Sequence, residues 1–253
     1  MALAALPFVL FFASIPAAAL NVDRLTSDEE ALHTATMAVL TPLIDARKEA
    51  DTAALLTWDE LYAPLDASQR AFLDGFRTLR GKHLGATSHY FGEDAKADIV
   101  AVDAQSFRKD GVDTPIDRQY LPKETLDAYT RMMDAMQRDL GRRLLVESGY
   151  RAPAYQLYLF LFYMPKHGYS IRETNRFVAL PGHSEHGFAP KQAIDFINTD
   201  GVNGEDHPEE FEALPEYAWL SQHASEYGFA LSYPRNNADN TTFEPWHWRH
   251  EIR

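Results

Sequence analysis

The sequence predicts an α+β fold in which a mostly helical N-terminal region precedes a part built on a small antiparallel sheet with flanking helices. Residues 20–100 carry apolar side chains at helical spacing between helix-capping residues. After residue 146, short runs with strand character alternate with helical segments, which is typical of an α+β domain. A chain of 253 residues with 45% hydrophobic content is large enough to bury a core.

Composition limits the classes of function. The chain has 24 Lys and Arg against 37 Asp and Glu, which gives a formal net charge of −13. This balance argues against a general nucleic-acid binder and against electrostatic docking on anionic lipid. The chain contains no cysteine, so disulfides, thiolate-bound metals and a cysteine nucleophile are excluded. Any zinc site must therefore use His, Asp or Glu.

The first nineteen residues predict an export signal. They carry no charged side chain, and their apolar run is followed by Ser14, Pro16 and three alanines. This pattern is typical of a signal peptide with cleavage after Ala19, although no Lys or Arg precedes the apolar run. The alternative is an uncleaved membrane anchor, for which the run is short. We expect a secreted or periplasmic protein with no stable membrane span after cleavage.

Capping residues and spacing predict the elements. The segment 27–30 resembles a capping box that opens a helix to about Ala50, with Pro42 as a kink or break. A second helix opens at Asp66 and stops at Gly81. Further elements are expected as follows: a short strand at 97–102, a long helix over about 123–147, a strand or turn at 146–151, an aromatic-rich helix at 154–167, a strand at 194–197, a helix within 208–227, and strands at 229–233 and around 243–249.

Two histidine neighbourhoods stand out. In the first, a polar turn at 181–186 leads toward the apolar segment 194–196, whose centre is Asp195. If this segment is extended, Asp195 points away from its two apolar neighbours and can face a cleft. The alternative is a capping Asp beside a solvated His186.

The second neighbourhood lies among large aromatics near the chain end, where Glu244 precedes His247. A catalytic zinc needs three protein ligands and one open position, and His186, Asp195 and His247 supply two imidazoles and a carboxylate. Glu244 would then take a proton from a water whose pKa the metal lowers. On a regular strand Glu244 and His247 would face opposite sides, so Pro245 must break the regularity. The alternative is a surface pair between Glu244 and Arg249.

Three blocks resemble the VanY-type D-alanyl-D-alanine carboxypeptidases, a metallopeptidase group that also contains lysostaphin-like enzymes and hedgehog domains. The resemblance covers roughly residues 120–253. The blocks are Ser148-Gly149-Tyr150-Arg151 with Gln156 following, Ser184-x-His186 with Ala193-x-Asp195, and Glu244-Pro245-Trp246-His247-Trp248-Arg249.

The resemblance implies a role for each matching residue. It implies one zinc ion per chain with three ligands: His186, Asp195 and His247. It also implies that Glu244 is the catalytic base and that Arg151 stabilises the oxyanion at the scissile carbonyl. Three residues would lie near bound substrate: Ser184, Gln156 and Tyr150.

The chain departs from the family pattern in the zinc motif. Six residues, 187–192, separate His186 from Ala193 where about four are usual. The ligand pair is kept if the extra residues loop out at the rim of the cleft. His183 is a competing candidate for the metal, but the spacing of His186 from Ser184 matches the family.

Taken together, the N-terminal pattern, the helical spacing and the resemblance predict a signal peptide (1–19), a helical N-terminal region (20–115) and a catalytic domain (116–253). The implied enzyme is a zinc D-alanyl-D-alanine carboxypeptidase that acts on peptidoglycan stem peptides. Three alternatives remain: a peptidoglycan endopeptidase of the same fold, a dipeptidase for free D-Ala-D-Ala, and a non-catalytic zinc-containing wall-binding module. Ser106-Phe107-Arg108-Lys109 matches the S-x-x-K motif of serine carboxypeptidases but lacks that family's partner motifs.

Overall fold

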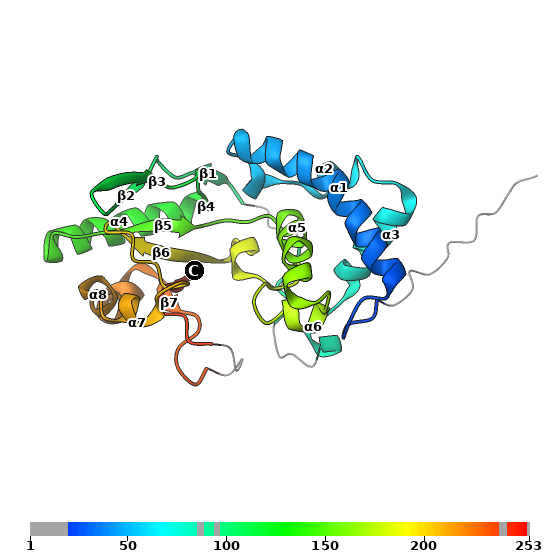
Figure 1. The fold of residues 1–253 in the computed structure, drawn as a ribbon. Coiled ribbons are helices and arrows are strands. Elements are labelled where there is room, and N and C mark those ends of the chain that lie inside the picture. The colour runs from blue at the N-terminus through cyan, green and yellow to red at the C-terminus, as the bar shows by residue number, and fades with distance from the viewer. Residues whose placement is uncertain (1–19, 85–88, 94–96, 238–241, 252–253) are drawn as a thin grey trace, which may run out of the picture.

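The computed structural model describes residues 20–84, 89–93, 97–237 and 242–251. The predicted signal peptide, residues 1–19, lies outside these ranges. A helical N-terminal part stands on one side of the molecule and a sheet with its helices on the other, with α5 (Pro153–Tyr163) between them (Figure 1). This arrangement confirms the predicted α+β class with a helical N-terminal region.

The N-terminal part consists of α1 (Ser27–Glu49), η1 (Ala53–Leu55), α2 (Trp58–Tyr62), α3 (Ala67–Thr78) and η2 (Gly81–Leu84). Thr26, rather than Ser27, caps α1, because its hydroxyl accepts from the Glu29 backbone while the Glu29 carboxylate accepts in return. Of the expected kink or break at Pro42, the break is wrong, because the helix continues through this residue. The predicted cap at Asp66 is confirmed, but α3 ends at Thr78, before the expected stop at Gly81.

Two small antiparallel pairs follow. β1 (Ile99–Ala101) pairs with β4 (Tyr120–Pro122), and β2 (Ser106–Lys109) pairs with β3 (Val112–Pro115). α4 (Lys123–Leu140) then runs beside the main sheet. It ends seven residues earlier than predicted because Gly141 adopts a left-handed conformation with φ of 67°, which terminates the helix.

The main sheet has four antiparallel strands in the order β5-β6-β8-β7. The strands are β5 (Leu144–Ser148), β6 (Lys191–Asn198), β7 (Phe229–Leu231) and β8 (His247–Glu251). The remaining helices are η3 (Met164–His167), α6 (Ile171–Thr174), η4 (Glu185–Gly187), α7 (Pro208–Glu212), α8 (Pro215–His223) and η5 (Ala224–Tyr227). The helix predicted within 208–227 is confirmed as α8, with α7 before it and η5 after it.

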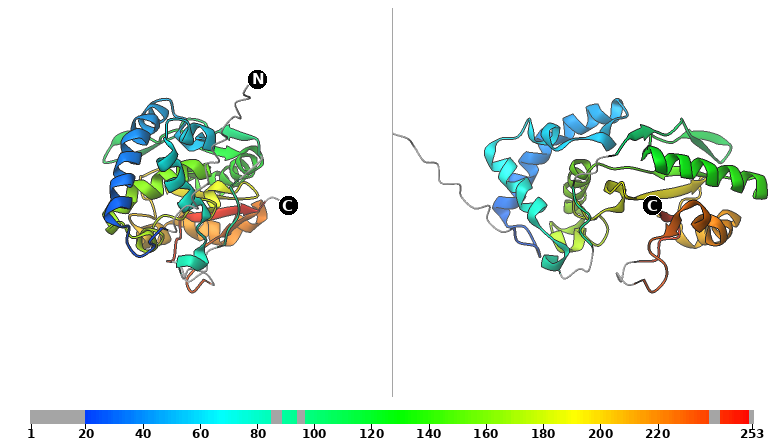
Figure 2. Two further views of the ribbon diagram at one scale, coloured as in Figure 1. Left: turned by 90° about the vertical axis from the view of Figure 1, so that its right-hand side faces the viewer. Right: turned by 180° about the vertical axis from the view of Figure 1, so that it is seen from behind.

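One face of this sheet forms a hydrophobic core with α4 and α8. Met132 and Met136 from α4 contact a cluster that includes Ile194, Phe196 and Trp248 from the strands. The views from the side and from behind show α4 lying along the sheet (Figure 2). The methionines fill the core, as their helical spacing predicts. The opposite face carries Asp195 and His247, together with the buried apolar pair Leu145 and Ile197.

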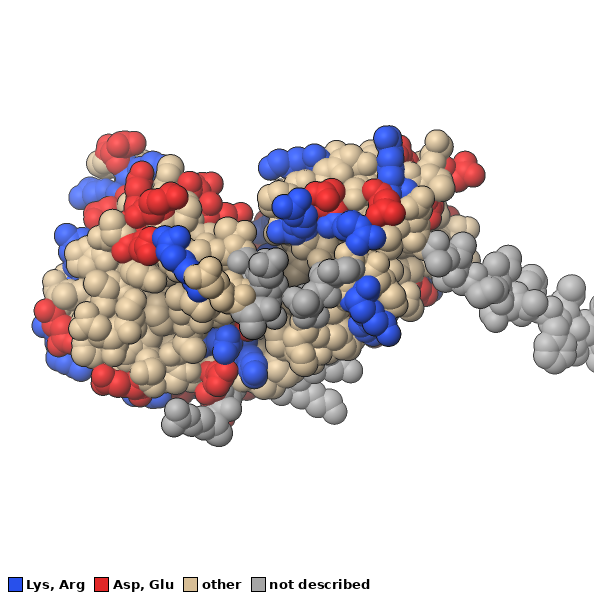
Figure 3. Space-filling model, turned by 90° about the horizontal axis from the view of Figure 1, so that it is seen from below, with Lys and Arg blue, Asp and Glu red and all other residues tan. Residues whose placement is uncertain are grey.

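The N-terminal part packs mainly on α5. Leu40, Phe72 and Phe76 form a second core with Leu157 and Phe160 of α5. Seen from below, the surface is notched between the two parts, and acidic and basic side chains are interspersed on this face (Figure 3). None of the helices within the described ranges is both long and apolar enough to cross a bilayer.

Candidate metal centre

The pairing of β6 in the main sheet places Asp195 on the face opposite the hydrophobic core. Ile194 and Phe196 are fully buried in the core, so Asp195 between them points to the opposite side. This confirms the orientation predicted from alternation. Asp195 is paired with His247 on β8 and with Ser148 on β5. The sheet therefore holds a carboxylate and an imidazole, 52 positions apart in sequence, on one face.

Three side chains converge at this point. Asp195 Oδ2 lies 3.0 Å from His186 Nε2, and Asp195 Oδ1 lies 2.7 Å from His247 Nδ1. One donor atom from each residue lies within 4.8 Å of the others. His183 is not part of this group, and its ring packs against Tyr90. The six residues between His186 and Ala193 form the end of η4, a turn and the start of β6, and they do not separate the donors.

The backbone beneath the site orients His186. Its Nδ1 lies 2.8 Å from the carbonyl oxygen of Gly149. A carbonyl can only accept, so Nδ1 carries the hydrogen and Nε2 keeps a free lone pair directed at Asp195. Gly149 is required here because a Cβ would lie 2.3 Å from the carbonyl oxygen of Tyr120. The glycine of the S-G-Y-R block thus permits the close packing that holds His186.

His247 lies between two carboxylates. Its Nε2 is 3.0 Å from Glu185 Oε2, and the same oxygen accepts a 2.5 Å hydrogen bond from Ser232. Burial disfavours the charged ring, but Asp195 and the hydrogen bonds to Asp195 and Glu185 raise the pKa of His247 to about 10. Without a metal, the protonated form of His247 is thus favoured, and its Nδ1 proton points toward Asp195, where a metal ion would bind.

Sequence reasoning missed Glu185. This side chain is only 7% exposed, although it follows Ser184 in a turn of polar residues. Burial is the largest single effect and would raise its pKa, but the hydrogen bond and charge of His247, together with Ser232 and Arg249, outweigh it, and the pKa is lowered. The only signal in the sequence is its position inside the S-x-H motif, because burial of a charged residue cannot be inferred from local pattern.

Glu244 lies beside the three donors. Its Oε2 is 3.9 Å from His247 Nδ1. The chain turns at Pro245 and Trp246, with the His247 amide donating to the Glu244 carbonyl, so β8 begins only at His247. Because this turn precedes the strand, Glu244 and His247 can lie on the same side although they are three residues apart. Burial raises the pKa of Glu244 to about 7, with further contributions from Asp195 and other carboxylates.

Arg151 faces the site from the loop after β5. Its backbone amide donates to the carbonyl of His186, at 3.0 Å. The Nε atom is buried and has no hydrogen-bond partner among the described residues. Burial lowers the pKa of the guanidinium, while the charge of Asp195 acts in the opposite direction. A desolvated guanidinium with an unused donor is suited to binding an oxyanion.

The three predicted substrate contacts differ in their surroundings. Ser184 caps η4 by accepting from the His186 amide, and Tyr150 is buried against Tyr120 beside Arg151. Gln156 is 3% exposed, and its amide donates to the carbonyl of Ala179. Ser184 thus contacts a donor loop and Tyr150 lies next to Arg151, whereas Gln156 contacts the chain before the 181–186 turn. Their roles toward substrate stay predictions.

The donor set fits zinc. Two neutral imidazole nitrogens and one carboxylate oxygen are the ligands of many catalytic zinc sites, and three protein ligands leave a position open. Each imidazole is held through its other nitrogen, by Gly149 or by Glu185, as is usual for metal-binding histidines. Burial would raise the pKa of Asp195, but both histidines together outweigh this effect and keep it ionised.

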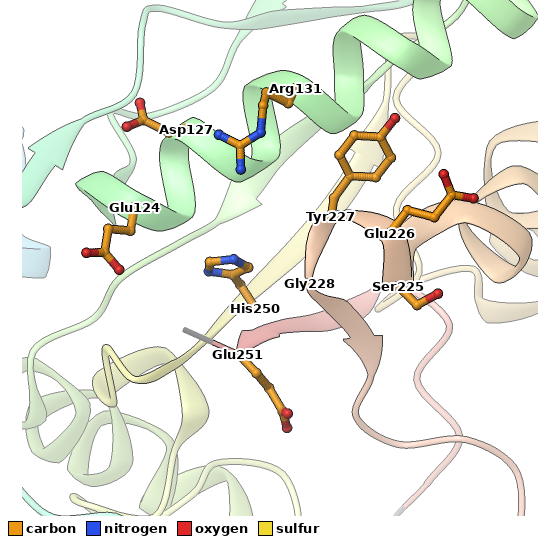
Figure 4. Close-up of a pocket in the computed structure, with 9 residues that line it drawn as sticks. All are labelled: Glu124, Asp127, Arg131, Ser225, Glu226, Tyr227, Gly228, His250 and Glu251. Carbon is orange, nitrogen blue, oxygen red and sulfur yellow. The ribbon is translucent and has the colours of Figure 1, made fainter. Parts of the chain in front are cut away.

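Other polar features lie apart from these donors. A pocket of about 370 Å³ between α4 and β8 is lined by His250, Arg131 and several acidic residues (Figure 4). His250 Nδ1 contacts the Thr125 hydroxyl at 3.0 Å, which gives this histidine a structural partner. In the S-x-x-K segment, Ser106 and Lys109 lie three apart on β2 and so point to opposite faces.

The fold and the site thus define a class: an α+β protein with a His-Asp-His metal-donor group, an adjacent carboxylate and a buried arginine. A family model described as VanY, D-alanyl-D-alanine carboxypeptidase, matches residues 118–252. The match spans more than half of the chain, and the chain belongs to this family.

Curated relatives agree with this assignment. The protein YodJ of Bacillus subtilis (strain 168) is 34% identical over 137 residues, which are 53% of this chain and 48% of YodJ. The bifunctional D-Ala-D-Ala dipeptidase and D-Ala-D-Ala carboxypeptidase VanXYC of Enterococcus gallinarum is 30% identical over 137 residues, 52% of this chain and 67% of that protein. The chain spans about half the length of YodJ.

A solved structure shares the fold. The LdcB LD-carboxypeptidase superposes with a TM-score of 0.50 and 27% sequence identity, covering 67% of this chain and 77% of LdcB. The family match begins at residue 118, so it does not include the helices of the N-terminal part.

Proposed function

We propose that this protein is a zinc-dependent D-alanyl-D-alanine carboxypeptidase that acts on peptidoglycan stem peptides. The observation that carries the proposal is the convergence of His186, Asp195 and His247 within 4.8 Å, with Glu244 alongside. When bound, zinc would supply Lewis acidity and lower the pKa of water toward neutrality. A non-catalytic wall-binding module would need neither Glu244 nor Arg151 near the donors.

Glu244 is the proton carrier in this proposal. It lies next to the donor group rather than in it, and its side chain is 29% exposed. A carboxylate there accepts a proton from the attacking water and delivers it to the amine of the departing D-alanine. Its pKa, raised to about 7 by burial, makes it a stronger base than an exposed glutamate when it is ionised.

Arg151 supplies the positive charge for the developing oxyanion. Its guanidinium is held near Asp195, and the His186–Arg151 backbone hydrogen bond links its loop to a ligand loop. Because the Nε donor is already desolvated, a negative oxygen formed next to it regains a hydrogen bond without further desolvation. This stabilisation is stronger for the tetrahedral oxyanion than for a neutral carbonyl, which is the requirement for catalysis.

The test uses purified protein, zinc and a pentapeptide that ends in D-Ala-D-Ala. We expect release of one D-alanine, identified by mass spectrometry, and loss of this activity when a chelator removes the metal. Glu244→Gln should retain zinc, measured by elemental analysis, and lose at least about a hundredfold in kcat. Release of a longer fragment would instead favour an endopeptidase, and acylation by a β-lactam would favour the serine alternative.

We also propose export of the protein through residues 1–19. The support is the uncharged apolar run followed by small residues that end at Ala19. Expression with the native N-terminus should yield a secreted or periplasmic form whose sequence begins at Leu20. An intact N-terminus in the membrane fraction would favour the anchor.

A further inference from the structure

One of the turns that form the metal site contacts a distant segment of the chain. This turn, residues 181–188, is called the donor turn below, and the segment, residues 89–93, follows the helices of the N-terminal part. The amides of Phe91 and Gly92 both donate to the Gly182 carbonyl oxygen, at 2.8 and 3.3 Å. The donor turn is therefore hydrogen-bonded to a segment that lies outside the region that the family model matches.

Close packing joins the donor turn to segment 89–93. Gly182 has a φ of 78°, and a Cβ at this position would lie 2.5 Å from the Tyr90 ring and 3.1 Å from the Gly92 carbonyl oxygen. The Tyr90 ring also meets the His183 ring at an edge, with 5.2 Å between the two centroids. The donor turn can approach the segment this closely only because residue 182 is a glycine.

A stacked aromatic pair extends this contact to the end of the donor turn. Phe188 lies two residues after His186, and its ring stacks on Phe91 with 5.3 Å between the centroids and 24° between the planes. Such a pair contributes about two- to tenfold to an equilibrium constant. Leu180, directly before the donor turn, is buried in the core that the N-terminal part forms with α5. The N-terminal part therefore contacts the chain at both ends of the donor turn.

Two arginines attach segment 89–93 to the end of α3. Arg77 donates to the Glu93 carboxylate through Nε at 3.0 Å and through Nη2 at 2.7 Å. The Arg80 guanidinium lies 3.9 Å from the centroid of the Tyr90 ring. A paired charge-assisted hydrogen bond and a cation–π contact both restrict the position of a segment. Segment 89–93 is therefore held by a helix that is itself packed in the core of the N-terminal part.

Movement of the donor turn would change two contacts of the metal site together. His186 Nε2 lies 3.0 Å from Asp195 Oδ2, and Glu185 Oε2 lies 3.0 Å from His247 Nε2. The donor turn thus carries one metal donor and also the carboxylate that orients another. A cation that needs both imidazoles therefore binds the conformation of the turn that segment 89–93 contacts.

We propose that Tyr90 and Phe91 are positioning residues of the metal site, which hold the donor turn in the conformation in which His186 faces Asp195. The inference rests on the zinc site of the proposed function and extends that site to a segment outside the matched region. Because zinc and segment 89–93 select the same conformation of the donor turn, each stabilises the binding of the other, and the coupling is reciprocal.

The first test measures zinc affinity. Tyr90→Ala combined with Phe91→Ala removes both rings that contact the donor turn. We expect the zinc Kd, measured by competition with a fluorescent chelator, to rise about tenfold, as for the loss of one or two aromatic contacts. Tyr90→Phe combined with Phe91→Tyr keeps both rings and should bind zinc within about twofold of the parent Kd. A Kd for the alanine pair within twofold of the parent value, in a folded protein, would overturn the proposal.

Phe162→Ala is the matched control for this test. Its ring stacks on Tyr158 of α5 with 6.1 Å between the centroids and 28° between the planes, a geometry close to that of the Phe91–Phe188 pair. We expect this variant to change the zinc Kd less than about twofold. A loss of affinity as large as that of the alanine pair would show that zinc binding follows the loss of any stacked ring, which would also overturn the proposal.

The second test uses the unmodified protein, so it does not depend on the folding of a variant. Saturating zinc should slow hydrogen exchange of the Phe91 and Gly92 amides about tenfold, because both donate to the donor turn. The amides of β2 and β3, which pair only with each other, should change less than about twofold. Equal exchange of Phe91 and Gly92 with and without zinc would contradict the reciprocal coupling and overturn the proposal.

These measurements separate the inference from the proposed function, because neither of them depends on hydrolysis. If the parent protein hydrolyses no peptide that ends in D-Ala-D-Ala but both zinc effects are found, the peptidase assignment is wrong and the positioning role stands. If the parent protein releases D-alanine but the alanine pair binds zinc with the parent Kd, the positioning role is wrong and the peptidase stands.

Discussion

Glu185→Gln tests whether the carboxylate behind His247 supports metal binding. Glu185 Oε2 is 3.0 Å from His247 Nε2 in a buried environment, so the contact is a charge-assisted hydrogen bond that directs Nδ1 toward Asp195. Glutamine has nearly the same shape and keeps an acceptor oxygen, but it lacks the charge. The substitution therefore isolates the electrostatic contribution of Glu185.

The expected loss lies in zinc affinity. Partners of metal-binding histidines typically contribute about 10- to 100-fold to affinity, which corresponds to about 1.4 to 2.7 kcal/mol. Because glutamine retains a weaker hydrogen bond, we expect a loss near tenfold for Glu185→Gln. In the metal-free protein, the pKa of His247 should fall from about 10, because one of the groups that raise it is neutralised.

Competition with a fluorescent chelator would measure the zinc Kd, and NMR titration would measure the pKa of His247. Ser232→Ala is the matched control, because it removes the other donor to Glu185, at 2.5 Å, and leaves the contact with His247. We expect it to change the zinc Kd less than about threefold. A zinc Kd for Glu185→Gln within twofold of the parent value, in a folded protein, would refute the reasoning.

Three further predictions follow from the same geometry. The pKa of Glu147 is raised from 4.5 to about 7, so its contribution to stability is present below about pH 4.5 and is lost as pH rises through 7. Glu147→Gln should thus stabilise the metal-free protein at pH 8, by at most about 3 kcal/mol, and change little at pH 4, measured by urea unfolding; an equal effect at both pH values would contradict this. Gly149→Ala should destabilise by at least about 2 kcal/mol, because its Cβ would lie 2.3 Å from the Tyr120 carbonyl oxygen, and a melting temperature within 2 °C of the parent would argue against this close packing. Gly204→Ala would place a Cβ 2.2 Å from the Trp246 ring, so kcat should fall through displacement of the Glu244 turn, and an unchanged kcat would show that the turn tolerates the shift.

Local pattern was sufficient for some features of the site. The alternation of apolar and polar residues predicts that Asp195 points away from the core. Pro245 predicts an interruption of the strand before His247. Both follow from the immediate chain neighbours, and the structure has both. The α4 boundary shows the limit of this approach: Leu144 continues the helical spacing of Leu140, but Gly141 between them ends the helix.

Features that depend on distant contacts could not be predicted. The sequence shows Glu185 and Glu147 as ordinary acidic residues, and only the fold buries them beside His247 and Asn203. Likewise, no local signal indicates that Ala54 contacts the loop of Arg151. Ala54 and Ala152 are about a hundred residues apart in the chain. Neither composition nor periodicity predicts a contact over such a distance.

One strand register fixes both the metal-donor group and the hydrophobic core, on opposite faces of β6. Asp195 lies opposite His247 only because Ile194 and Phe196 occupy the core on the other side of β6. A shift of the pairing by one residue would turn Asp195 into the core and expose two large apolar side chains. Burial of Ile194 and Phe196 therefore selects the register that holds the donors together. It follows that a core substitution far from any ligand, such as one at Met136, which packs in the same cluster, can weaken metal binding through the sheet alone.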